Sequence, residues 1–218
     1  MEAALKQFAD EVHVKPENLQ ELDLDDQQIH ELTESDMKAL SKCHNLVRLS
    51  IGDNGLKKVN ANFPSLPKLT MLDLRGNDLN SDVLGSISRL TNLSVLMLTH
   101  NQIKTLDKFS NLKGLTHLQF LGLEGCPVTE NHPDYRKTLF ELLPSLEIVD
   151  FVDKEGNEIE RPEEEEEDEG NLADFYNKEY SDDEEDEEYE GDEEEPEDEE
   201  LEEDAEEEDQ PPTKKHKP

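Results

Sequence analysis

An eleven-residue pattern, Leu-x-x-Leu-x-Leu-x-x-Asn/Cys-x-Leu, recurs in phase along the N-terminal part of the chain. Successive copies lie 27, 23, 24, 25 and 28 residues apart, and the last copy is partial. A repeat of this length is one supersecondary unit that cannot bury its apolar face alone, so neighbouring copies have to stack. The copies begin at Leu19, Leu46, Leu69, Leu93, Leu118 and Leu146.

This spacing is typical of leucine-rich repeats and predicts an α/β solenoid. Each copy should add a short strand to a curved parallel sheet on the concave face, with its leucine pair pointing inward. Helical or 3₁₀ turns should return along the convex face. The Asn or Cys at each turn can satisfy backbone groups that would otherwise be buried unpaired. Because Gln27 is longer and Cys126 is a weaker donor, this ladder should be poorest at its ends.

Apolar spacing predicts how the convex face is built and how the stack is closed. Residues 2–13 carry Leu5, Phe8, Ala9 and Val12 on one helical face, which predicts a capping helix. Residues 103–115 repeat every third position, as in a 3₁₀ helix, and residues 80–92 resemble an α-helix. Aromatic and leucine residues from Tyr135 to Phe151 should cap the other end. The expected organisation is a capping helix (1–18), five repeats (19–128), a C-terminal cap (129–161) and an acidic tail (162–218).

The charge of the chain is concentrated in that tail. Residues 163–210 hold 32 acidic residues and one base, Lys178, so this stretch carries −31 of the total of −37. Lys214, Lys215 and Lys217 add +3, which leaves −9 for residues 1–162. Dense like charge with few apolar residues predicts a disordered tail. The preceding part should be a mildly acidic folded domain.

Several classes of protein are disfavoured by the sequence. No apolar run approaches the roughly 18 residues that a membrane span needs. The two cysteines, Cys43 and Cys126, form no disulfide framework, so we expect an intracellular protein without membrane contact. No nucleophile elbow, phosphate loop or metal-ligand motif is present, which predicts a non-enzyme without cofactor or metal. Direct nucleic-acid binding is disfavoured by the net charge.

The chain resembles the acidic leucine-rich nuclear phosphoprotein 32 family over nearly its whole length. The resemblance rests on the five repeats, the closing segment 134–146, the acidic tail with Tyr189 in its Glu-Glu-Tyr-Glu sequence, and the terminal basic cluster. It implies nuclear proteins that shuttle to the cytoplasm, bind core histones, inhibit histone acetylation and inhibit protein phosphatase 2A. Two departures are that Lys15 precedes Pro16 where family members can carry a phosphorylatable Thr, and that the tail is comparatively short.

The tail itself is the first candidate binding region. Its like charges should keep it open for core histones or other basic proteins, although the same acids could serve solubility alone. Leu172 lies on one potential helical face with three aromatic residues, which either anchor a partner or dock back on the domain. Ser181 precedes an acidic run and resembles an acidophilic kinase site. The aromatic candidates are Phe175, Tyr176, Tyr180 and Tyr189; Lys214, Lys215 and Lys217 form a candidate nuclear localisation signal, which could instead fold back onto the acids.

The concave face of the solenoid is the second candidate. Its N-terminal part should be polar and its C-terminal part apolar, and an exposed apolar patch usually marks an interface. The cap or the root of the tail could instead cover that patch. The candidate partner-binding residues on this face are Met71, Asp73, Val95, Met97 and Phe120.

We therefore expect a nuclear histone-binding protein or chaperone that regulates histone modification through the tail and the concave face. One alternative is a regulator of protein phosphatase 2A acting through the repeat domain. Another is a ribonucleoprotein scaffold, which shares the repeats and cap but leaves the acidic tail unexplained.

Overall fold

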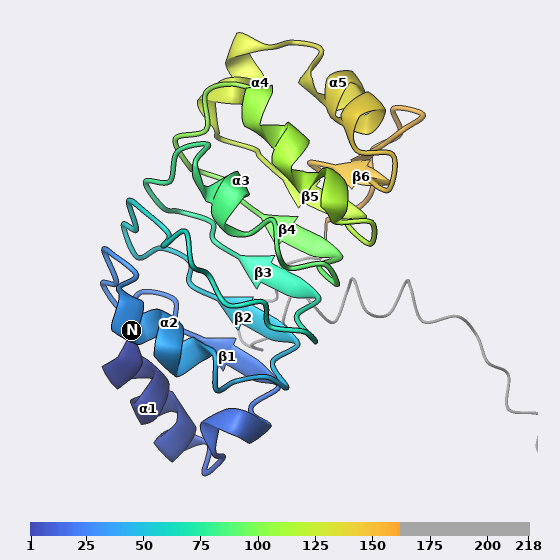
Figure 1. Cartoon of the computed structure of the whole chain (residues 1–218). Coiled ribbons are helices and arrows are strands. Elements are labelled where there is room, and N and C mark those ends of the chain that lie inside the picture. The colour runs from blue at the N-terminus through green and yellow to red at the C-terminus, as the bar shows by residue number, and fades with distance from the viewer. Residues whose placement is uncertain (162–218) are drawn as a thin grey trace, which may run out of the picture. The chain divides into compact units, whose positions relative to one another are not determined.

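The computed structural model describes residues 1–161, which form a leucine-rich-repeat solenoid, as predicted. Its sheet has seven strands in chain order (Figure 1). The first six pair in parallel and the seventh is antiparallel. The strands are β1 (Glu21–Asp23), β2 (Arg48–Ser50), β3 (Met71–Asp73), β4 (Val95–Met97), β5 (Phe120–Gly122), β6 (Ile148–Val149) and β7 (Val152–Asp153).

The core is a stack of leucines behind this sheet. The middle residue of each of the first five strands is at most 2% exposed, and so is Val149 in β6. These side chains belong to one continuous cluster that runs from Leu5 in the N-terminal helix to Val149. Each repeat therefore completes the core of its neighbour, which is how a repeat too small to fold alone becomes stable.

Buried asparagines tie the turns of adjacent repeats together. The Asn54 amide donates to the carbonyls of Leu24 (2.8 Å) and Gly52 (2.7 Å), and its oxygen accepts from the Ile29 amide (2.9 Å). Asn77 and Asn101 repeat this arrangement. At the ends, Gln27 is exposed and reaches the Asp25 carbonyl at 3.3 Å, while the Cys126 thiol donates to Leu98 O at 3.1 Å. The ladder is poorest at its ends, as expected.

The convex face carries short helices of different kinds. The 3₁₀ helix η2 (Asp107–Gly114) confirms the every-third-residue pattern, but α3 (Val83–Ser86) is much shorter than the helix expected over 80–92. Helix α2 (Glu34–Leu40) was not anticipated. It begins at a capping box in which Thr33 and Asp36 satisfy each other's backbone amides. The Thr-x-x-Asp sequence before an apolar run was the available signal.

Helices close both ends of the stack (Figure 1). Helix α1 (Glu2–Glu11) buries Leu5 and Ala9 and contacts α2, β1 and the 3₁₀ turn η1 (Pro16–Asn18). Val12 was expected on its buried face, but it lies past the end of the helix and is 44% exposed. At the other end lie α4 (Pro127–Asn131) and α5 (Tyr135–Leu142). No helix within residues 1–161 has the length and apolar character that crossing a bilayer requires.

Candidate partner-binding surface

Two columns of side chains line the concave face of the sheet. Strand register aligns the first residues of the strands with one another, and likewise the third residues. Because side chains alternate across a strand, both columns lie opposite the leucine core. The first column reads Glu21, Arg48, Met71, Val95, Phe120 and Ile148, and the second reads Asp23, Ser50, Asp73, Met97 and Gly122.

The N-terminal half of this face is charged and internally paired. Arg48 forms an ion pair with Glu21 on the neighbouring strand. Arg75, just past β3, lies 3.5 Å from both Asp73 and Asp25. Asp25 also accepts a hydrogen bond from the Ser50 hydroxyl at 2.6 Å. Asp73 was predicted from the sequence, but Arg75 and Asp25 were not. Each lies two positions after an aspartate of the face, Asp73 or Asp23, and this alternation could have indicated that they line the same side.

Asp73 is the titratable group most perturbed by this arrangement. It is only 4% exposed, and burial raises the pKa of its carboxyl to about 6. The Arg75 guanidinium and the Arg75 amide, which donates to Asp73 Oδ1 at 2.9 Å, limit that rise, whereas Asp25 and Asp53 add to it. Because this pKa lies close to neutral pH, small changes in the charges around Asp73 change the fraction of its carboxyl group that is protonated.

The C-terminal half is apolar and closely packed. Met71, Val95, Met97, Phe120 and Ile148 form a cluster separate from the leucine core, here called the concave cluster. Gly122 makes room for Met97, because an added Cβ there would lie 3.2 Å from the Met97 sulfur. The cluster residues are only 1–8% exposed. The apolar patch was predicted correctly in its residues, but the expectation that it is exposed is wrong.

Residues of the C-terminal cap supply part of the cover. Phe151 and Ile159 pack against the concave cluster, and the Phe151 ring meets that of Phe120 edge-on with 5.3 Å between centroids. The Arg161 guanidinium lies 4.8 Å from the Phe151 ring centre and pairs with Glu124 at 2.8 Å. The cap was one of the two covers considered from the sequence. Phe151 was expected in this cap, but its contact with Phe120 and the roles of Ile159 and Arg161 were not predicted.

Asp150 anchors that cap and positions Phe151. Its carboxylate accepts hydrogen bonds from the Leu123 and Glu124 amides and from the Tyr135 hydroxyl at 2.6 Å. Burial, reinforced by this bond and by the negative charge of Asp150, raises the pKa of Tyr135 far above its usual range. Asp150 and Phe151 both have positive φ (51° and 58°), so the chain turns sharply here. That turn carries Phe151 to the concave side.

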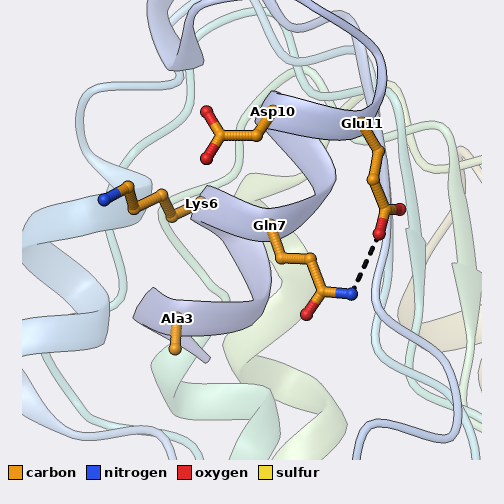
Figure 2. Close-up of a pocket in the computed structure, with 5 residues that line it drawn as sticks. All are labelled: Ala3, Lys6, Gln7, Asp10 and Glu11. Carbon is orange, nitrogen blue, oxygen red and sulfur yellow. Dashed lines mark hydrogen bonds between the residues drawn. The ribbon is translucent and has the colours of Figure 1, made fainter.

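Two pockets among the described residues lie away from this face. Five α1 residues line a shallow concavity of about 480 Å³, where the Gln7 amide donates to Glu11 at 2.9 Å (Figure 2). Ala3, Lys6 and Asp10 complete its lining, so one solvent-facing helix surface forms all of it. A second pocket of about 590 Å³ lies between α1, η1 and α2. Among residues 1–161 there is no group of three or more metal-ligating side chains.

The remaining predicted sites fall on residues 162–218, outside the part that the structure describes. They are Phe175, Tyr176, Tyr180, Tyr189, Ser181, Lys214, Lys215 and Lys217. They stay predictions from the sequence.

A family model described as leucine-rich repeat matches residues 13–173. The chain belongs to the leucine-rich repeat family. An acidic leucine-rich nuclear phosphoprotein 32-related protein of Plasmodium falciparum is 36% identical over 172 residues, which cover 76% of this chain and 60% of the relative. An acidic leucine-rich nuclear phosphoprotein 32-related protein 1 of Caenorhabditis elegans is 38% identical over 120 residues, which cover 53% of this chain and 51% of the relative.

These relatives support the family named from the sequence, although the chain spans only 60% and 51% of their lengths. Among solved structures, the Drosophila melanogaster SNF/U2A′ complex contains a chain that matches with a TM-score of 0.51 and 28% identity, over 62% of this chain and 74% of that one. Leucine-rich-repeat domains typically bind proteins rather than catalyse reactions. Membership of the leucine-rich repeat family indicates a protein-binding role, and the two relatives are named as related to a nuclear phosphoprotein.

Proposed function

We propose that the protein is a nuclear histone-binding protein or chaperone that regulates histone modification through its acidic segment and its concave face. The observation that carries this proposal is the concentration of charge: residues 163–210 carry −31, whereas residues 1–162 carry −9. Such a polyanion attracts strongly basic proteins, and core histones are the partners implied by the family. No enzymatic step is required of it.

The density of this charge suits a chaperone. In an extended chain of about 3.4 Å per residue, the acids of residues 163–210 fall roughly every 5 Å. Duplex DNA carries a charge about every 1.7 Å. The segment should therefore shield free histones and still yield them to DNA.

The folded part contributes position and shape rather than free charge. Arg48 and Arg75 pair with acids of the same face and so offset part of its negative charge. Arg161 is held against Phe151 and Glu124, so the acidic segment starts at a defined place beside the concave cluster. A histone held by the acids would thus meet this face of the repeat stack.

Purified core histones provide the test. The full chain and a variant ending at Arg161 are compared in pull-downs at increasing salt, with thermal melts to show that the variant stays folded. We expect the full chain to retain histones at low salt and release them at high salt, and the truncated variant to lose most of the binding. Binding retained by the truncated variant would contradict the assignment to the acidic segment.

Two alternatives remain proposals of a different class. In one, the repeat domain regulates protein phosphatase 2A; inhibition of that phosphatase by the truncated variant would support it. In the other, the chain is a ribonucleoprotein scaffold, which the likeness to the SNF/U2A′ complex favours. Capture of a ribonucleoprotein subunit through the concave face, without any need for residues 162–218, would separate this alternative from histone binding.

Three further features belong to the same proposal. Lys214, Lys215 and Lys217 would direct nuclear import, and shuttling to the cytoplasm would follow the family pattern. Phosphate on Ser181 would add about −1.5 to −2 charge to the acidic segment and strengthen its attraction for basic proteins.

A further inference from the structure

The concave cluster has the burial of a covered surface. Met71 on β3, and Val95 and Met97 on β4, are only 4–8% exposed although they lie opposite the leucine core. Phe151 and Ile159 pack on the cluster, and they flank β7 at the end of the C-terminal cap. The apolar surface therefore extends from this cap across four strands, β3 to β6.

The end of the described chain lies beside this surface. The Ile159 amide donates to the Phe151 carbonyl at 2.8 Å, and Arg161 is held by the Phe151 ring and by Glu124. The chain therefore leaves the folded part beside the concave cluster. Whatever follows residue 161 starts within short reach of Val95 and Met71.

The sequence beyond Arg161 contains one stretch suited to an apolar surface. Residues 163–169 are seven acids in a row, and residues 181–190 contain eight acids. Between them, residues 171–180 carry a net charge of only −1. That window holds Leu172, Phe175, Tyr176 and Tyr180, spaced for one face of a helix.

We propose that residues 172–180 dock on the concave cluster of the same chain and complete its cover. Leu172 lies eleven positions after Arg161, and the connection can span roughly 37 Å when extended. Crossing from β6 to β3 takes three strand spacings, or about 14 Å. Because the connection is covalent and short, the segment is present at a high effective concentration, which favours it over a separate partner or a second copy.

This docking goes beyond the proposed function and does not depend on it. It makes the aromatic segment and the apolar half of the concave face cover each other. Both surfaces are then withheld from partners until the segment is displaced, whereas the acids of residues 181–210 remain available for basic proteins.

A single tryptophan tests the docking in the full chain, because the protein contains none. Phe175→Trp places the probe in the segment, and Tyr189→Trp places it in the acidic run as a matched control. We expect Phe175→Trp to emit at shorter wavelength and to be quenched by acrylamide several-fold less than Tyr189→Trp. Equal emission and equal quenching of the two variants would overturn the proposal.

Second-site changes identify the surface. Val95→Glu, added to Phe175→Trp, should restore quenching, whereas Val12→Glu, the same change at an exposed position, should not. Because Val95→Glu could disturb folding, Leu172→Asp with Tyr180→Asp provides a second route that leaves the repeats unaltered and should also restore quenching. Three results would contradict intramolecular apolar docking. The protection from quenching could survive these tail changes, or it could be abolished by high salt. It could also depend on protein concentration, as docking on a second copy would.

Discussion

The two halves of the concave face occupy equivalent register positions of one sheet but carry opposite chemistry. On β1 and β2, Glu21, Arg48 and Ser50 are polar and only partly buried or exposed. From β3 to β6, the same columns hold methionine, valine, phenylalanine and isoleucine that are 1–8% exposed. Asp73 lies at the border and is the buried charge between them.

This difference shows how a repeat protein separates stability from recognition. The leucine column and the asparagine ladder are the same in both halves, so the backbone is held alike. The face residues are free to differ because they lie outside that core. In the apolar half they contribute to stability, whereas in the charged half they are mutually paired and contribute little.

The largest effect is expected from Phe120→Ala in the apolar half. Phe120 is 1% exposed and contacts Phe151, so its removal should lower the free energy of unfolding by about 3–5 kcal/mol. Chemical denaturation measures this loss. Val12→Ala, at an exposed position, is the matched control and should change stability little. A loss for Phe120→Ala no larger than the control would show that the cluster is not a packed core.

The border residue should make stability depend on pH. Because the pKa of Asp73 is raised from 3.8 to about 6, the folded state binds this proton more tightly than the unfolded chain. The stabilisation is complete below pH 3.8 and is lost as the pH rises through about 6, an effect of about 3 kcal/mol.

Asp73→Asn removes this titration. The free energies of unfolding of wild type and Asp73→Asn are measured from pH 4 to pH 7. As the pH rises, the value for the wild type should fall relative to that for Asp73→Asn. A constant difference over that range would mean that Asp73 is not protonated preferentially in the folded protein.

Asp150→Asn should have an intermediate effect. The Asp150 carboxylate accepts three hydrogen bonds, whereas an amide would direct an N–H group toward one of the three donors. The free energy of unfolding should fall by about 2 kcal/mol. Thermal unfolding measures the change, and Tyr135→Phe, which removes only one of the donors, should cost less. Equal stability of Asp150→Asn and wild type would mean that the carboxylate does not hold the cap.

Glu21→Gln in the charged half should have the smallest effect. It breaks the ion pair with Arg48, but the Glu21 side chain is 54% exposed, so the loss should be about 0.5 kcal/mol or less. Denaturant titration at low and high salt would detect it. A loss comparable to that of Phe120→Ala would erase the contrast between the halves.

Most of the fold followed from the sequence because the repeat is a local rule applied many times. The leucine and asparagine positions predicted the parallel sheet, its register and the ladder, including its weak ends at Gln27 and Cys126. The 3₁₀ turn of residues 107–114 also followed from apolar spacing. Such features depend on neighbouring repeats having the same geometry.

Features that break the repeat were harder to predict. The capped helix α2 and the turn at Asp150 are used once, so no periodicity indicates them. The concave face was placed correctly in columns, but part of its cover comes from Phe151 and Ile159, which pack against it beyond that turn. Single-use contacts between distant segments have no signature in a single sequence.

In the proposed function, the charge that attracts basic partners resides beyond Arg161, because the arginines of the charged half pair with acids and the apolar half is covered. Titrating core histones into the full chain at a series of salt concentrations tests it most directly. We predict that the dissociation constant rises steeply, on the order of tenfold or more, between roughly 50 and 200 mM salt. A dissociation constant that is insensitive to salt, but that rises when concave-face residues such as Val95 are changed, would contradict it.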